Sequence, residues 1–130
     1  QGLELYKAKQ YLSAQVALKN SLQGKLSEEQ KAEANYVIAI AAIRLGQANG
    51  EALLVQFVEE FPLSPKRNIA FLEVGDYYFE QNNFVKSYEW YQKVQEGNLS
   101  QASAEKYYFQ RGYAAYANNK KKEKMCEPFF

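Results

Sequence analysis

The stretch NIAFLEVGDYYFEQNNFVKSYEWYQKV, residues 68–94, contains two amphipathic segments on either side of a polar turn, QNN at residues 81–83. This spacing of apolar residues predicts two helices joined by a tight turn. The small residues Gly75 and Ser87 would let the two backbones approach each other, while larger residues fill the space around the contact. The residues at helical spacing are Phe71, Val74, Gly75 and Tyr78 before the turn, and Phe84, Ser87, Tyr91 and Val94 after it.

Small residues recur along the whole chain, because Gly2, Ala39, Gly75 and Gly112 follow one another at spacings of 37, 36 and 37 residues. A regular period of this length indicates a helical repeat protein, in which each helix pair buries its second face against a neighbour. We therefore predict an all-α fold without strands. A single repeat domain would cover residues 1–130, with repeats at about 1–26, 27–64, 65–99 and 100–130.

Capping and stop signals set the predicted ends of the helices. Ser27 with Gln30 is typical of a capping box, and Ser64-Pro65 and Ser100 can each begin a helix. A one-residue shift places Ala52 in the second repeat at the slot of Ser87. In the fourth repeat, a turn after residue 117 would place Cys126 at that slot, as a packing residue, and Phe130 at the slot of Tyr91. The predicted helices span about 1–8, 11–22, 28–45, 50–60, 66–81, 84–96, 102–117 and 122–130.

These residues resemble the tetratricopeptide repeat family, in which an aromatic, a small residue and a second aromatic precede an alanine-rich second helix. The resemblance implies antiparallel helix pairs stacked in a right-handed superhelix. The junction FVEEFPLSP, residues 57–65, is similar to the longer repeats of bacterial cell-envelope proteins. It implies a periplasmic or cell-envelope location, with a cytoplasmic location as the alternative. The chain has no initiator Met, and we expect it to be a fragment of a longer protein.

The resemblance also implies a binding surface. In the family, the first helices of the repeats line a concave groove that binds extended or helical peptides. About half of the groove residues are expected to pack against the adjacent helix pair instead. The Lys and Asn residues that hold a C-terminal carboxylate in some members are replaced here, so no such clamp is expected. The residues carried over to the groove are Tyr36, Ile40, Ile43, Leu72, Asp76, Phe79, Phe109, Tyr113 and Tyr116.

Composition argues against several other functions. The chain has no His, which removes the commonest general base and metal ligand, and we predict neither an enzyme nor a cofactor. Its net charge is +1, so a nucleic-acid partner is not expected; the Lys run at 120–124 is read as a solvated turn. No stretch of apolar residues is long enough to span a membrane. The neighbouring carboxylates Glu73, Asp76 and Glu80 are typical of a solvated helix face.

The leading hypothesis is therefore a protein–protein interaction scaffold that binds an apolar or amphipathic segment of other proteins in its groove. Two alternatives remain open at this stage. One is a glycan-binding module that uses exposed aromatic residues. The other is a self-association module that acts through the open ends of the repeat array. The identity of the partner does not follow from the fold, since repeat scaffolds share an architecture while their groove residues vary.

Overall fold

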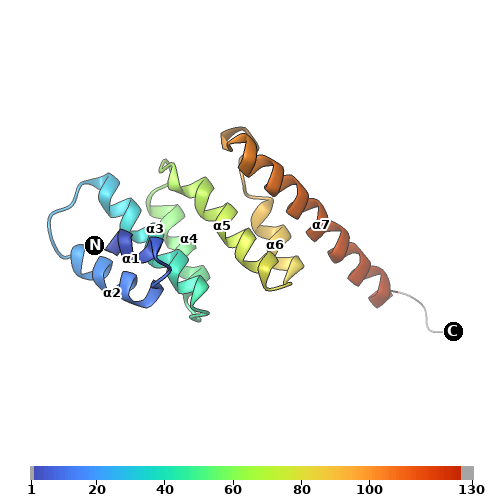
Figure 1. Cartoon of the computed structure of the whole chain (residues 1–130), viewed down its shortest axis with the longest axis horizontal. Helices are drawn as coiled ribbons and strands as arrows, with labels where there is room; N and C mark the ends of the chain where they lie inside the picture. Colours follow the sequence, from blue (N-terminus) through green and yellow to red (C-terminus); the bar gives the residue numbers. More distant parts are fainter. Residues whose placement is uncertain (1, 127–130) are drawn as a thin grey trace. The chain divides into compact units, whose positions relative to one another are not determined.

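A computed structural model of the chain describes residues 2–126, and the side chains of residues 2–120. This part of the chain is all-helical and contains no strand, which confirms the predicted class (Figure 1). None of its helices combines the length and the apolar composition that a membrane span requires. The helices are α1 (Gly2–Lys7), α2 (Tyr11–Ser21), α3 (Glu28–Arg44), α4 (Gly50–Glu60), α5 (Lys66–Glu80), α6 (Phe84–Tyr91), a 3-10 helix η1 (Glu96–Asn98) and α7 (Gln101–Cys126).

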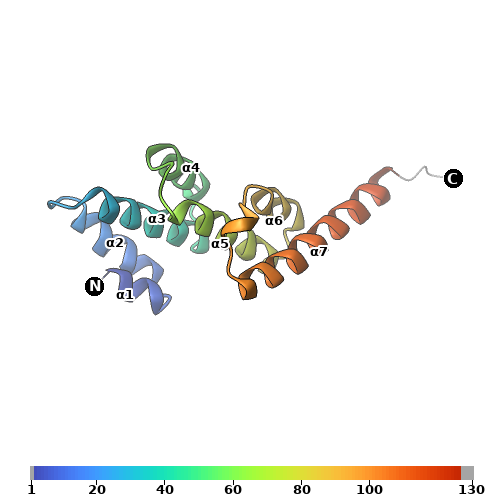
Figure 2. The same ribbon diagram turned by 90° about the horizontal axis from the view of Figure 1, so that it is seen from above.

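Contacts divide the chain into two compact units, Gln1–Ala70 and Phe71–Phe130, here called unit 1 and unit 2. The boundary falls inside α5 and does not coincide with any junction between the predicted repeats. In unit 1, consecutive helices pack on one another, α1 on α2, α2 on α3 and α3 on α4. Helix α3 lies between α2 and α4 (Figure 2), and every residue from Tyr36 to Ile43 is buried. It is the core helix of this unit.

The predicted start of α3 is confirmed by its cap. The Ser27 side chain accepts a hydrogen bond from the Gln30 backbone N–H at 3.1 Å, and the Gln30 side chain accepts one from the Ser27 N–H at 3.0 Å. At the other end of the helix pair, Gly50 begins α4 directly against α3. A Cβ at this position would lie 2.9 Å from Ile43 Cγ1. Gly50, and not the exposed Ala52, is therefore the small residue of this contact, and the predicted one-residue shift is wrong.

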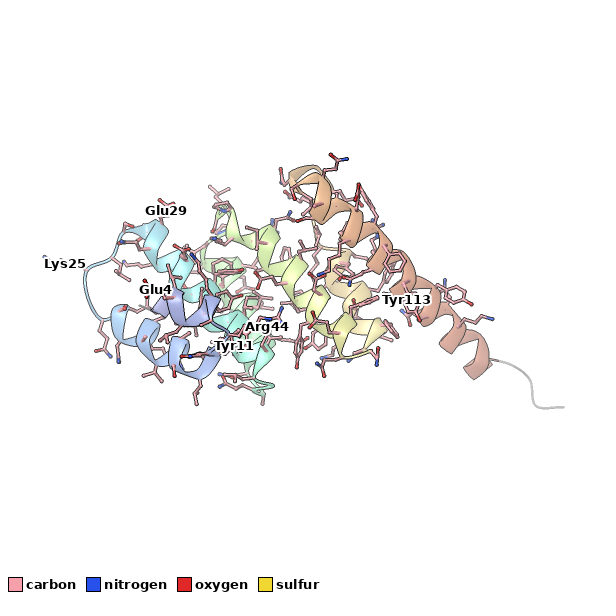
Figure 3. The ribbon with its side chains drawn as sticks, in the orientation of Figure 1. Glu4, Tyr11, Lys25, Glu29, Arg44 and Tyr113 are labelled. Atoms are coloured by element: carbon pink, nitrogen blue, oxygen red, sulfur yellow. The ribbon has the colours of Figure 1, made fainter. Side chains whose placement is uncertain are left out.

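A buried polar side chain, which the repeat pattern did not predict, joins α2 to α3. Gln15 is 2% exposed, and its amide donates to the Ile38 carbonyl oxygen at 3.2 Å and pairs with the Gln47 side chain. Nearby, the Arg44 guanidinium lies 6.0 Å from the centre of the Tyr11 ring, and Figure 3 labels both residues. A buried amide is tolerated only when it is hydrogen-bonded, and Gln15 meets this condition.

Unit 2 contains the predicted pair of α5 and α6. The Ser87 hydroxyl donates to the Gly75 carbonyl oxygen at 2.9 Å, and the ring of Tyr91, which is 0% exposed, covers the Gly75 backbone so closely that a Cβ would overlap it. In unit 1 the same contact recurs, because a Cβ at Gly2 would lie 2.6 Å from Leu18 Cγ. Each small residue therefore meets the residue 16 positions later. The repeat register is confirmed at these two places.

The end of the chain differs from the prediction. Residues 118–121 were expected to form a turn, but α7 continues as one helix from Gln101 to Cys126. No Gly or Pro occurs between Gly112 and Pro128, so no residue in this segment forces a helix to end. A separate second helix of the fourth repeat, predicted at 122–130, is therefore wrong over residues 122–126, which belong to α7. The side chain of Cys126 and the whole of Phe130 lie outside the described residues.

Helix α6 also ends earlier than predicted, at Tyr91 rather than near residue 96. The backbone N–H groups of Lys93 and Val94 bond three residues back, to Trp90 and Tyr91, at 3.1 Å each. This tightening of the last turn is common at helix ends. It directs the following segment, with η1, toward α7. Ser100 then begins α7, since its side chain accepts a hydrogen bond from the Ser103 N–H at 3.3 Å, as the sequence predicted.

Replacing Tyr91 with Ala should destabilise the protein by about 3–5 kcal/mol, as expected when a large aromatic side chain is removed from a core. The side chain is 0% exposed and touches all three helices of unit 2. Urea unfolding followed by circular dichroism measures the change. Glu89→Ala, an exposed position on the same helix, is the matched control and should cost less than about 0.5 kcal/mol. Equal losses would contradict the assignment of the buried face.

Two glycines give an opposed pair of substitutions. Gly75→Ala forces a methyl group into the buried Tyr91 ring and should cost about 1–3 kcal/mol. Gly112→Ala, in an exposed helical position with no atom within 4 Å of its added Cβ, should instead stabilise the helix by up to about 1 kcal/mol. Urea titrations at low protein concentration measure both. A stabilising Gly75→Ala would show that Tyr91 does not rest on that backbone.

Candidate functional site

The predicted groove residues of unit 1 do not form an exposed surface. Tyr36, Ile40 and Ile43 are 4%, 1% and 4% exposed, because α3 is covered by α2 on one side and α4 on the other. The Tyr36 ring packs against Tyr6 and Phe57, with centroid distances of 6.4 and 6.1 Å. These three residues therefore belong to the core, and we exclude them from the candidate surface.

The predicted residues of unit 2 are placed differently. On α7, Phe109, Tyr113 and Tyr116 are 70%, 47% and 60% exposed, and their spacing of four and three residues puts them on one face of the helix. On α5, Leu72, Asp76 and Phe79 are partly buried. Residues predicted from the fourth repeat therefore supply most of the exposed aromatic area.

Three aromatic rings connect α5, α6 and α7 at one edge of this face. Phe79 and Tyr113 lie 5.7 Å apart between ring centroids, and Phe84 lies 5.4 Å from Phe79 and 5.3 Å from Tyr113. All three pairs are edge-to-face, the arrangement that aromatic quadrupoles favour. Figure 3 labels Tyr113 on α7. We call Phe79, Phe84, Phe109, Tyr113 and Tyr116 together the aromatic surface. Phe84 had been predicted as a packing residue and not as part of the site.

The opposite face of α7 explains why these aromatic side chains are exposed. Tyr107 is 1% exposed and Ala114 is 0% exposed, and both face the rest of unit 2. The Tyr107 hydroxyl donates to the Tyr91 carbonyl oxygen at 3.0 Å, and the two rings meet edge-to-face at 5.5 Å. Because Tyr107 turns inward, Phe109 and Tyr116, which lie about half a turn away around the helix, must turn outward. Contiguous exposed aromatic residues of this kind are typical of interaction sites.

A polar group lies beneath the aromatic surface. The buried Tyr91 hydroxyl donates to the Asp76 carboxylate and lies 2.7 Å from Gln110 Oε1. Lys106 Nζ lies 3.6 Å from Asp76 Oδ2. Burial raises the pKa of Tyr91, and the hydrogen bond to Asp76 raises it further, so the hydroxyl stays protonated as a donor. The Asp76 carboxylate, which the sequence placed in the groove, is thus already bound by the Tyr91 hydroxyl and by the exposed Lys106.

A second polar cluster fixes α7 at the loop that precedes it. Glu96 pairs with Arg111 and accepts a hydrogen bond from the Tyr108 hydroxyl at 2.9 Å. Arg111 also donates to the Tyr107 hydroxyl at 3.3 Å. The hydrogen bond from Tyr108 lowers the pKa of Glu96, and Arg111 lowers it further. Sequence reasoning missed this cluster, because Glu96 and Arg111 are 15 residues apart and belong to no periodic pattern.

Among the residues that the structure describes, no group of three or more His, Cys, Asp or Glu side chains could hold a metal ion. No protein-family model matches the chain, and no curated protein and no solved structure is significantly similar to it. The tetratricopeptide resemblance therefore rests on the residues of the sequence alone.

Acid should remove the stabilisation that Glu96 provides. The pKa of its carboxyl is lower in the folded chain than the ordinary 4.5, so the stabilisation is complete above about pH 4.5. It is lost as the pH falls through the lowered folded pKa. Glu96→Gln should therefore reduce stability at pH 6 and flatten the decline between about pH 5 and 3. Thermal unfolding across this range measures both effects. Glu89→Gln, at an exposed position of α6, is the matched control, and an unchanged decline in Glu96→Gln would contradict the assignment.

Proposed function

We propose that this chain is a protein–protein interaction scaffold whose unit 2 binds an apolar or amphipathic segment of another protein on the aromatic surface. The observation that carries the proposal is the exposure of Phe109, Tyr113 and Tyr116 on one face of α7, at 70%, 47% and 60%. Large aromatic side chains are the residues that most often anchor interfaces. They lose little conformational entropy on binding, since each has only two side-chain torsions.

The neighbouring polar groups favour a protein segment over a glycan. A sugar needs hydrogen-bonding partners beside the stacking rings, because its hydroxyl groups lose water on binding. Here Asp76, the carboxylate beside Phe79 on α5, already accepts from Tyr91 and pairs with Lys106. The Gln110 side chain is likewise close to the Tyr91 hydroxyl. The aromatic surface therefore offers mostly apolar area, which an amphipathic helix or an extended apolar peptide would cover.

The proposal includes a tetratricopeptide-like arrangement of the repeats in a right-handed superhelix. It is supported by the contact between a small residue and the large residue 16 positions later, which occurs at Gly2 with Leu18 and at Gly75 with Tyr91. In that arrangement α5 and α7 are the first helices of their repeats and carry the binding residues. A cell-envelope location is a further part of the proposal, and its support is the Phe-Pro-x-Ser-Pro junction at residues 61–65.

Phe109→Ala is the substitution that tests the surface most cleanly. Phe109 is the most exposed residue of the aromatic surface. Phe79, in contrast, packs against Phe84 and Tyr113, and its removal would also disturb the fold. A displayed library of helical peptides is selected on the wild-type chain, and the affinity of the selected peptides is measured by fluorescence anisotropy. We expect apolar residues at positions i, i+3 or i+4, and i+7 of the selected peptides. Phe109→Ala should weaken their binding by roughly thirtyfold or more.

The matched control is Leu12→Ala, which removes a side chain of 61% exposure from α2 in unit 1. This variant should bind the selected peptides as the wild type does, and circular dichroism should show equal helicity for all three proteins. Unchanged peptide binding by Phe109→Ala would refute the proposal. A glycan array provides a second test. If the chain binds a glycan and Phe109→Ala abolishes that binding, the result would favour a glycan-binding role over the proposed one.

A further inference from the structure

The outward face of α7 carries a sequence pattern that is symmetric in reverse. Counting from the midpoint between residues 112 and 113, Phe109 and Tyr116 are equally distant, and so are Glu105 and Lys120. All four side chains are exposed and lie on the face opposite to Tyr107 and Ala114. A helix with this pattern is complementary to an antiparallel copy of itself. Aromatic residues then meet aromatic residues, and each Glu105 meets a lysine.

Gly112 lies beside the centre of the pattern. No contact among the described residues requires a glycine at this position. Glycine inside a helix costs stability, and at Gly75 the benefit is the close fit of the Tyr91 ring. Gly112 is the equivalent small residue of the fourth repeat, yet an added Cβ there would meet nothing within 4 Å. An absent side chain on an exposed face allows another backbone to approach closely. In the reversed pairing Gly112 lies opposite residue 113, so the missing side chain leaves room for the Tyr113 ring of an opposing helix.

We propose that a second copy of this chain is a partner of the aromatic surface, with the two α7 helices packed antiparallel across a two-fold axis between residues 112 and 113. This inference rests on the proposed function, since it uses the same surface. In the dimer, Phe109 packs against Tyr116 of the second copy, and Glu105 pairs with Lys120 of the second copy. The contact is isologous and closed, so it produces dimers and not filaments. A parallel arrangement is disfavoured, because like charges at positions 105 and 120 would then meet.

The size of the surface sets the expected affinity. Aromatic side chains bury about 150–250 Å² each, so Phe109, Tyr113 and Tyr116 at their observed exposure contribute on the order of 350 Å² per copy. A standard stable interface buries about 800 Å² per partner. The dimer is therefore weak, with a dissociation constant above about 1 μM. A dimer of this strength leaves the aromatic surface accessible to other protein segments at low concentration.

A charge exchange tests this geometry. Sedimentation equilibrium is measured on wild type, Glu105→Lys and Lys120→Glu, all carrying Cys126→Ser so that no disulfide contributes. The wild type should associate with increasing concentration. Each single variant should associate roughly tenfold more weakly, because its homodimer brings like charges together. An equimolar mixture of the two single variants should recover the wild-type affinity, since every 105–120 pair is then of opposite sign. The antiparallel register is identified by the two results together, because in a parallel pairing the wild type would already bring like charges together and the single variants would not associate more weakly than it does.

Gly112→Ala provides an independent readout. It should raise the melting temperature of the isolated chain and at the same time weaken self-association. If Gly112 had only a structural role, the melting temperature and the association constant would not change in opposite directions. A wild-type chain that stays monomeric at about 1 mM, while the selected peptides still bind, would overturn this inference and leave the proposed function in place. Association that is insensitive to the charge exchange would also overturn it. A wild-type chain that neither associates nor binds any peptide of the library would refute both.

Discussion

The contact between the Tyr91 ring and the Gly75 backbone is the constraint on which unit 2 depends. Because Gly75 has no side chain, α6 approaches α5 closely enough for the Ser87 hydroxyl to reach the Gly75 carbonyl oxygen. The same tyrosine then fixes α7, since its carbonyl oxygen accepts from the Tyr107 hydroxyl. Its own hydroxyl reaches the Asp76 carboxylate. One residue thus connects all three helices of the unit, and its burial keeps its hydroxyl protonated.

The orientation of α7 follows from this anchor and determines which residues are available for binding. Tyr107 faces inward, and the ion pair of Arg111 with Glu96 joins the helix to the segment that precedes it. Phe109 and Tyr116, on the other face, then have no partner helix in the described part of unit 2 and remain exposed. Their exposure is therefore a consequence of how the core is built. The proposed protein-binding role and the proposed antiparallel dimer both use this face.

Unit 1 shows what happens when a first helix is covered on both sides. Helix α3 lies between α2 and α4, so Tyr36, Ile40 and Ile43 are core residues. In the repeat alignment they occupy the positions of Leu72, Asp76 and Phe79, each 36 residues later. The repeat alignment alone assigns the same role to equivalent positions. Packing separates them, because α3 has a helix on each side while the outward face of α7 has none among the described residues.

The sequence by itself determined the helical class, the turn at residues 81–83, the cap at Ser27 and the contact of Gly75 with Ser87, since these depend on local spacing and on small residues at fixed intervals. It also identified the aromatic residues of α7 as candidates for binding. The tertiary structure alone decided which candidates are exposed and which side chain forms each long-range contact. Gln15 with Ile38 and Glu96 with Arg111 are examples. Such pairs leave no periodic signal, because they depend on the three-dimensional path of the chain and not on the spacing along it. The continuation of α7 through residues 118–121 lies between these cases. The repeat alignment suggested a turn after residue 117, but without Gly or Pro the helix continues.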